Sequence, residues 1–380
     1  MKNSHIAFVS FPHPPHVNPT LPIVSVLVRR GFRVTYATSH KFASRVAELG
    51  AEVVSCPEFR VGSLSETEEF DRVICELEEI TPFYERNRPD LLVYDFMSLA
   101  GRILANRWDV PAIQTSPTFA LDKDNLSHQV KDPELRKVIL DWSKQINLFL
   151  EHHGIASGNF LFHRERLNIH LFPKALQLEG GALGEGCFYA GRCAGEQPYY
   201  GDWQKKNSEG KPIALVGTST THIRGPEYFR MCIAALSGLQ WHVVLSVGDA
   251  CDAASLMPLP PHFEIVRNTS HIKILRHASL YICLGGIITT AEAMYHGLPL
   301  IVTTHGALEL EWQADNIESL GIGIHLRKAD TNSENLRRAA IHVSEDHVLL
   351  QRVKQMQRAV QREPGGEETV NRIEEFLETC

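Results

Sequence analysis

The first 55 residues constrain the fold most strongly, because short apolar runs alternate there with amphipathic segments. The apolar run at residues 5–11 predicts a buried strand, and a helix is expected to follow, with Asn18 as its N-cap and Gly31 at its end. A second strand, a second helix and a third strand extend to Ser55. This βαβαβ succession predicts a parallel sheet with right-handed crossovers.

The same alternation resumes after a polar, non-periodic stretch at residues 194–211, which we interpret as a linker. A chain of 380 residues is long enough for two domains. We therefore expect an α/β protein with Rossmann-like domains over residues 1–200 and 201–365, whose doubly wound parallel sheets face each other across a cleft. Residues 366–380 are expected to form a helix that packs back on the first domain.

Further elements are expected along both halves of the chain. In the first half, the expected helices cover residues 65–86 and 132–153, and the expected strands cover 90–96, 111–115, 167–172 and 187–190. In the second half, the expected strands cover 213–216, 241–247, 280–284, 299–303 and 323–326, with helices over 226–236, from about 289, and over 309–320.

Composition narrows the partners and the compartment. The formal net charge of -7 disfavours a nucleic-acid partner. The eight cysteines form no CxxC motif or Cys/His cluster, so we expect no metal site and reduced thiols. The start of the chain lacks the pattern of a signal peptide, and no apolar run reaches about 18 residues, so we expect a cytoplasmic protein without a membrane span.

A candidate acid/base pair follows from the topology. Ligands of doubly wound sheets bind beyond the carboxyl ends of the strands, where the strand order reverses. His16, in the loop after the first strand, and Asp95, at the end of the fourth, are therefore expected to lie close together. A carboxylate on one imidazole nitrogen leaves the other basic. His13 competes with His16, and the alternative is that His16 is a helix-entry residue and Asp95 a loop residue.

The second half offers a candidate phosphate site. Residues 217–221 (GTSTT) and 285–290 (GGIITT) each follow an expected strand. The second run leads into a helix N-terminus, where free N–H groups and the helix dipole favour an anion. Gly285 and Gly286 would admit the ligand, and Thr289 and Thr290 would add hydroxyl donors. The alternative is an ordinary glycine-rich turn. Neither a P-loop nor a GxGxxG motif occurs.

The chain resembles the bacterial UDP-glycosyltransferases of the macrolide-glycosyltransferase type, which have the GT-B fold. The resemblance covers nearly the whole length. It rests in the first half on HVNPTLPIVSVLVRRGFRVTYAT, PDLLVYDF, NRWDVPAI and LNIHLFPKALQ, and in the second on PEYFRMCIAAL, WHVVLSVG, ILRHASLYI, EAMYHGLPLIV and ESLGIGIHL.

The resemblance implies that His16, in HVNP, is the catalytic base and that Asp95, in VYDF, orients it. The implied reaction is inverting: the base deprotonates an acceptor hydroxyl, which attacks the anomeric carbon of a nucleotide sugar. It implies no cofactor and no metal beyond the nucleotide sugar as co-substrate, because helix dipoles and hydrogen bonds take the diphosphate charge. The donor and phosphate contacts expected from the residues present are Ser219, Thr220, Gly285, Gly286, Thr289, Thr290 and Glu309.

The donor half departs from the family pattern at several polar positions. Leu284 replaces the histidine of HGG or HAG, and Ile288 and Thr289 follow where the family has Asn and Ser. His271 stands near the position of the glutamine that frames the nucleobase. Each substitution removes or alters a polar contact with the donor, while the apolar scaffold keeps the family pattern.

The acceptor pocket is expected to be apolar and suited to a lipophilic metabolite. Its expected lining is Phe11, His13, Phe96, Met97 and Phe119. The resulting hypothesis is transfer of a sugar from a UDP or dTDP sugar to a hydroxyl of a lipophilic natural product. The alternatives are a protein that has lost nucleotide-sugar binding and uses His16 and Asp95 for cyclisation, dehydration or isomerisation, and a non-catalytic partner of an active homologue.

Overall fold

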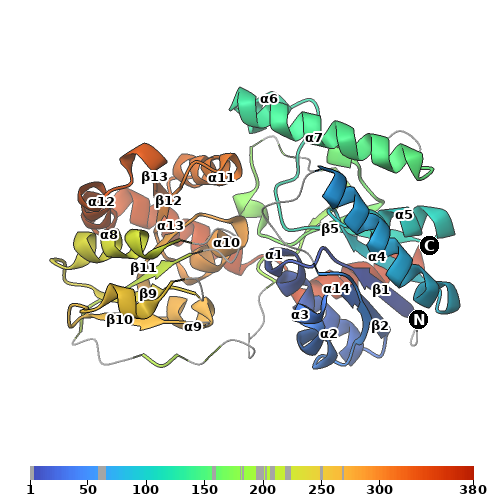
Figure 1. Ribbon diagram of the computed structural model, residues 1–380, viewed down its shortest axis with the longest axis horizontal. Helices are drawn as coiled ribbons and strands as arrows, with labels where there is room; N and C mark the ends of the chain where they lie inside the picture. The colour runs from blue at the N-terminus through green and yellow to red at the C-terminus, as the bar shows by residue number, and fades with distance from the viewer. Residues whose placement is uncertain are drawn as a thin grey trace. The chain divides into compact units, whose positions relative to one another are not determined.

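The structure is a computed structural model that divides into two compact units (Figure 1). The first unit comprises Met1–Gly195 with Glu363–Cys380, and the second comprises Glu196–Arg362. The residues described are 4–58, 66–155, 160–179, 181, 184–193, 201, 203–205, 210–218, 224–248, 251–267 and 269–380, without the side chains of 66–69 and 309. Most of the expected linker, together with Ser219 and Thr220, lies outside them.

The first unit is built on a seven-stranded parallel sheet in the order β3-β2-β1-β4-β5-β6-β7. The strands are β1 (His5–Val9), β2 (Arg33–Thr38), β3 (Glu52–Ser55), β4 (Leu91–Asp95), β5 (Ala112–Ser116), β6 (Leu167–His170) and β7 (Cys187–Tyr189). All five residues of β1 are buried, so both faces of the sheet centre are covered. The strand order reverses between β1 and β4, whose carboxyl ends therefore lie side by side.

Helices of the first unit follow the expected pattern with one correction. They are α1 (Pro14–Val17), α2 (Leu21–Arg29), α3 (His40–Ala47), α4 (Glu66–Arg86), α5 (Leu99–Trp108), α6 (Leu126–Gln129), α7 (Pro133–His152) and α14 (Gly366–Glu378). The prediction that Asn18 is an N-cap is wrong. Helical structure already begins at Pro14, and Asn18 opens a short 3-10 turn and accepts a hydrogen bond from Arg45.

The last helix, α14, packs against α2 of the same unit (Figure 1). Arg30 pairs with Glu367 at 2.7 Å and with Glu374 at 2.6 Å. Glu363, just before the helix, accepts hydrogen bonds from two backbone N–H groups of the first unit, those of Lys174 and Ala175. These contacts anchor the end of the described chain to the unit that contains its beginning.

The second unit repeats the design with a six-stranded parallel sheet in the order β10-β9-β8-β11-β12-β13. Its strands are β8 (Ile213–Gly217), β9 (His242–Ser246), β10 (Phe263–Val266), β11 (Ala278–Cys283), β12 (Leu300–Thr303) and β13 (Gly323–Leu326). Its helices are α8 (Pro226–Leu236), α9 (His271–Leu275), α10 (Ile287–His296), α11 (Leu308–Ser319), α12 (Ser333–Glu345) and α13 (His347–Gln361). The predicted fold class of two parallel, Rossmann-like sheets is confirmed.

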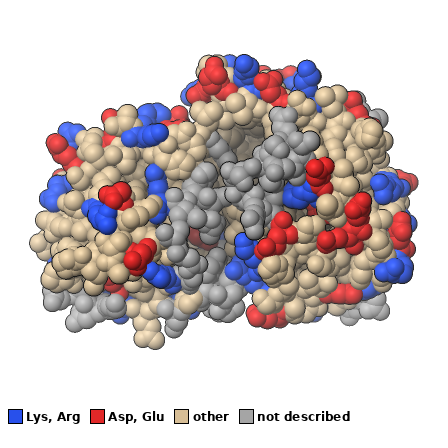
Figure 2. Space-filling model, viewed as in Figure 1, with Lys and Arg blue, Asp and Glu red and all other residues tan. Residues whose placement is uncertain are grey.

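Three further properties concern the whole chain. All eight cysteines are free thiols. Among the described residues, no helix combines the length and the apolar character that crossing a membrane requires. On the face shown in Figure 2, the basic and acidic side chains of the described residues are interspersed, in keeping with the modest net charge.

Candidate active site

His16 and Asp95 meet at the carboxyl ends of β1 and β4. His16 lies on α1, directly after β1, and Asp95 is the last residue of β4. The Nδ1 atom of His16 is 2.9 Å from Oδ2 of Asp95. The Asp95 side chain is fully buried, whereas the His16 side chain keeps 14% of its surface exposed. The hydrogen bond predicted from the topology is present.

Both carboxylate oxygens of Asp95 are engaged. Oδ1 accepts the backbone N–H of Met97 at 2.9 Å, while Oδ2 faces His16. An ionised carboxylate only accepts hydrogen bonds, so the contact suits the His16 tautomer that donates from Nδ1 and keeps a lone pair on Nε2. Among the described residues, Nε2 of His16 makes no hydrogen bond. The pair can therefore accept a proton from a hydroxyl placed beside Nε2.

Aromatic rings surround His16. Its ring centroid lies 5.1 Å from that of Phe11, 6.0 Å from that of Phe96 and 6.0 Å from that of His13. Three residues expected to line the acceptor pocket thus lie around His16. Met97 belongs to the same turn through its backbone bond to Asp95.

Phe119, the remaining residue expected in the acceptor pocket, lies in the segment after β5. It is 6% exposed, and its ring packs edge-on against Phe172 with the centroids 6.0 Å apart. Its described contact is therefore with the hydrophobic core at the β6 side of the sheet.

A buried ion pair on α4 adds charges that were not predicted at the site. The Arg72 guanidinium lies 5.1 Å from the centre of the Phe11 ring, and Arg72 and Glu76 are 3.6 Å apart. Burial raises the pKa of Glu76 to about 7; Arg72 opposes this shift and the charge of Asp95 adds to it. The i, i+4 spacing could have predicted the pair, but nothing local predicts its burial beside Phe11.

The glycine-rich loop after β11 is formed as a main-chain feature. Gly285 has a φ of +79°, and a Cβ there would come within 2.7 Å of the Val302 side chain. Gly286 is the N-cap of α10, and the first intrahelical bond in this turn runs from the Thr290 N–H to the Gly286 carbonyl. The N–H groups of Ile287, Ile288 and Thr289 precede that bond and have no partner within the helix, which is the arrangement that favours an anion.

The side chains of this loop mostly serve the structure. Thr290 is 3% exposed, and its hydroxyl donates to the Gly285 carbonyl at 3.3 Å. Leu284 is also 3% exposed. Thr289 is half-buried, and its hydroxyl belongs to one of the three residues whose N–H groups have no partner within the helix. Glu309 lies on α11, and its side chain is outside the described residues.

His271, which stands near the family's nucleobase-framing position, is held by other side chains. Its Nε2 is 2.8 Å from the Ser246 hydroxyl, and its Nδ1 is 2.9 Å from the Tyr281 hydroxyl. Loss of hydration lowers its pKa to about 4, so the ring is neutral. A Cβ at Gly217 would approach its ring to 2.9 Å, so the ends of β8 and β9 pack around it. His271 therefore has a structural role in this state.

The chain is similar along its whole length to known sugar transferases. The NDP-glycosyltransferase YjiC of Bacillus subtilis (strain 168) is 32% identical over 99% of this chain and 98% of its own. The oleandomycin glycosyltransferase of Streptomyces antibioticus is 28% identical over 98% of this chain and 91% of its own. A family model described as the C-terminal domain of erythromycin biosynthesis protein CIII-like proteins matches residues 230–376.

Comparison of the fold with solved structures also finds glycosyltransferases. The crystal structure of CalG4, the calicheamicin glycosyltransferase, is 29% identical and covers 100% of this chain and 99% of its own, with a TM-score of 0.82. These similarities favour sugar transfer over the alternative of a fold that has lost nucleotide-sugar binding. The chain belongs to the bacterial macrolide-type UDP-glycosyltransferases and is a glycosyltransferase.

Proposed function

We propose that this enzyme transfers a sugar from a UDP or dTDP sugar to a hydroxyl of a lipophilic natural product, with inversion at the anomeric carbon. His16 acts as the base and Asp95 orients it. The observation that supports these roles is the 2.9 Å contact between Nδ1 of His16 and Oδ2 of Asp95, which leaves Nε2 open.

In the proposed reaction one bond forms and one breaks at the anomeric carbon, and a single proton moves to His16. The acceptor hydroxyl gives its proton to Nε2 of His16 as its oxygen forms a bond to the anomeric carbon. The bond from that carbon to the diphosphate oxygen breaks, and the nucleoside diphosphate leaves with the electron pair. Asp95 stabilises the imidazolium that forms, because its buried carboxylate already accepts from Nδ1.

The donor diphosphate is proposed to bind at the start of α10. The free N–H groups of Ile287, Ile288 and Thr289, together with the helix dipole, supply the positive potential that the developing charge requires. In this proposal the transfer needs neither a metal nor another cofactor. Gly285, Gly286 and Thr289 form the site, joined by Ser219, Thr220 and Glu309, whereas Thr290 holds the loop.

The acceptor is proposed to be lipophilic. Phe11 and Phe96 lie beside His16 and His13 adds a polar edge, and we propose that Met97 completes this apolar pocket. Relatives named for macrolides, such as the oleandomycin enzyme, support an acceptor of this chemical class. We further expect a cytoplasmic enzyme without a nucleic-acid partner, because its eight thiols are free and its net charge is negative.

Ligand-induced stabilisation tests the donor half of the proposal. UDP and dTDP should each be added at increasing concentration, with inorganic phosphate as the control for a non-specific anion. A nucleotide at 100 times its dissociation constant should stabilise the protein by about 2.7 kcal/mol. Stabilisation by neither nucleotide, together with turnover of an acceptor when no donor is present, would contradict the proposal.

A further inference from the structure

A cavity lies where strands β5 and β6 of the first unit begin, at the opposite ends of the strands from His16 and Asp95. It has a volume of about 540 Å³, within the range of small-molecule sites. Its walls come from α5, from the segments that lead into β5 and β6, and from the end of α14. His16 and Asp95 lie where β1 and β4 end, so this cavity is separate from the candidate active site.

The cavity contains a guanidinium without a hydrogen-bond partner. Arg102 is 7% exposed, and its Nη1 atom is buried with no hydrogen bond. Among the described residues, the Arg102 side chain forms neither a hydrogen bond nor an ion pair. Burial lowers the pKa of Arg102, and the neighbouring Tyr94 and Glu165 oppose this shift. A buried charge is costly until an opposite charge approaches it.

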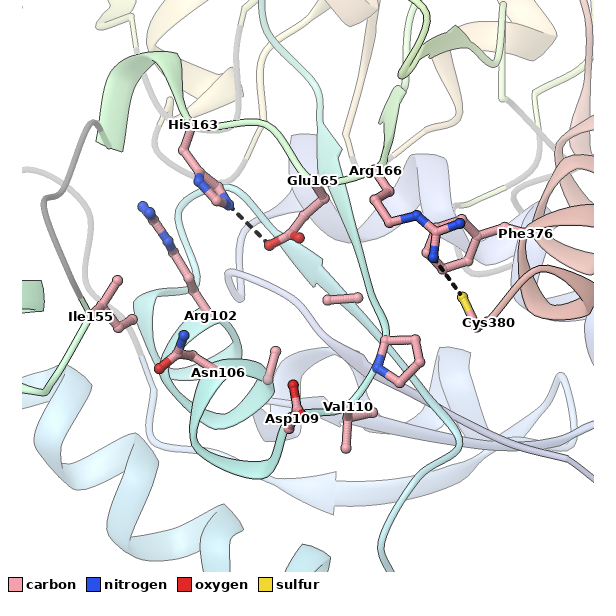
Figure 3. A pocket seen from close by; sticks show the side chains of 13 residues that line it. Arg102, Asn106, Asp109, Val110, Ile155, His163, Glu165, Arg166, Phe376 and Cys380 are labelled. Atoms are coloured by element: carbon pink, nitrogen blue, oxygen red, sulfur yellow. Dashed lines mark hydrogen bonds and ion pairs between the residues drawn. The ribbon is translucent and has the colours of Figure 1, made fainter.

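The neighbouring carboxylate does not satisfy Arg102. Glu165 accepts a hydrogen bond from the Tyr94 hydroxyl at 2.6 Å, and His163 Nε2 is 3.0 Å from its Oε1. Figure 3 shows Arg102 rising from α5 toward the segment that carries His163 and Glu165. Glu165 therefore offsets part of the charge of Arg102 without a hydrogen bond, and the guanidinium N–H groups remain available to an anion that enters the cavity.

The walls of the cavity are about equally polar and apolar, and the polar part comes from Asn106, Asp109, His163, Glu165 and Arg166 besides Arg102. Ala105, Val110, Ile155 and Phe376 line the cavity. Arg166 lies over the Phe376 ring, 5.3 Å from its centre (Figure 3), and hydrogen-bonds to Thr379 at 3.3 Å. The cavity thus combines a guanidinium that has no hydrogen-bond partner with apolar side chains, those of Val110, Ile155 and Phe376, that suit a hydrocarbon or an aromatic ring.

We infer that this cavity binds an amphipathic carboxylate, with its carboxylate on Arg102 and its apolar body against Val110, Ile155 and Phe376. A planar guanidinium matches a carboxylate in geometry, and the two oxygens can accept from adjacent N–H groups. An inorganic anion would satisfy Arg102 but would leave the apolar walls uncovered.

Binding of decanoate and decanol, measured by calorimetry, tests the inference. The two molecules share a chain, and only decanoate carries the charge. Decanoate should bind the wild type, and decanol should bind about ten- to hundredfold more weakly, because it lacks the charged pair. Arg102→Met keeps an unbranched side chain and should weaken decanoate binding by a similar factor. Arg107→Met, at an exposed arginine of the same helix, is the matched control and should leave it unchanged.

A second variant keeps the test decisive if Arg102→Met fails to fold. Val110→Trp, at a half-buried loop position, retains Arg102 but fills the space proposed for the apolar body, so it should also weaken decanoate binding at least tenfold. Decanoate bound near His16 would respond to neither variant. Equal affinity in the wild type and in the variants, or no binding to the wild type, would overturn the inference. Neither result bears on the sugar-transfer proposal.

Discussion

The two units place different chemistry at the same position of a similar fold. At the reversal of strand order, the first unit presents side chains: His16 and Asp95 at the ends of β1 and β4. The second unit presents main-chain N–H groups at the start of α10, while Leu284 and Thr290 turn into the structure. A doubly wound sheet can therefore supply an acid/base pair or an anion site from the same edge, depending on the residues after its strands.

The largest expected effect tests the side-chain chemistry of the first unit. His16→Ala should lower kcat by at least about 100-fold, because general-base catalysis is usually worth that much, and it should leave UDP affinity unchanged. His13→Ala is the matched control on the same loop and should change kcat much less, since it is His16 that pairs with Asp95. Initial rates at saturating donor and acceptor make the comparison. Equal losses in the two variants would show that the loop as a whole, and not the dyad, matters.

The next largest effect is expected when the Thr289 hydroxyl at the start of α10 is removed. Thr289→Val should weaken UDP or dTDP binding by about 1–3 kcal/mol, the cost of losing one good hydrogen bond, and should leave acceptor binding unchanged. Calorimetric titration measures both affinities. Thr290→Val should mainly lower stability, because its hydroxyl holds the Gly285 carbonyl. Unchanged donor affinity in Thr289→Val would remove that side chain from the donor site and leave main-chain contacts at the start of α10.

A difference of similar size, in stability and not in donor affinity, is expected between two neutral histidines, one in each unit. His271→Phe should lower the unfolding free energy by about 1–3 kcal/mol, since it leaves the Ser246 and Tyr281 hydroxyls without their partner. His170→Phe should cost little at neutral pH, because neither ring nitrogen of His170 has a hydrogen-bond partner and a phenyl ring can still stack on Tyr189. Equilibrium urea unfolding compares them. A larger loss in His170→Phe would reverse the assignment.

The last expected effect is absent at neutral pH and develops only as the pH falls. Burial, and then the charge of Arg164, lower the pKa of His170 to about 3 from its usual 6.5. Between these values the unfolded chain binds a proton that the folded chain does not, so stability falls as the pH falls below 6.5. His170→Phe should flatten this dependence by up to about 1.4 kcal/mol per pH unit. Unfolding midpoints from pH 7 to pH 4 measure it, and parallel curves for the two proteins would contradict the burial of a neutral ring.

The sequence predicts elements best where local signals and tertiary packing agree. The predicted bounds of α8 and β13 match the structure at both ends, because a proline start and a glycine-bounded apolar run define them. The elements β10 and α9 were not predicted, since both are short and their segment has no clear periodicity. The N-cap at Asn18 was wrong because prolines just upstream start the helical structure earlier.

The residues of the two sites also differ in how far the sequence predicts their positions. The contact between His16 and Asp95 follows from topology, because strand ends at a reversal of order must be neighbours. The positions of Arg72 and Arg102 do not follow from sequence, since each lies in an ordinary amphipathic helix. Only the packing of other elements determines that Arg72 lies over Phe11 and that Arg102 is buried without a hydrogen-bond partner.

A kinetic double-mutant cycle on His16 and Asp95 tests most directly whether the two residues act as one unit. It compares kcat for the wild type, His16→Ala, Asp95→Asn and the double variant. Asp95 is proposed to act only through His16, so the double variant should be no slower than His16→Ala alone. Losses that multiply, or a kcat near that of the wild type in His16→Ala, would contradict the dyad as the base of this transferase.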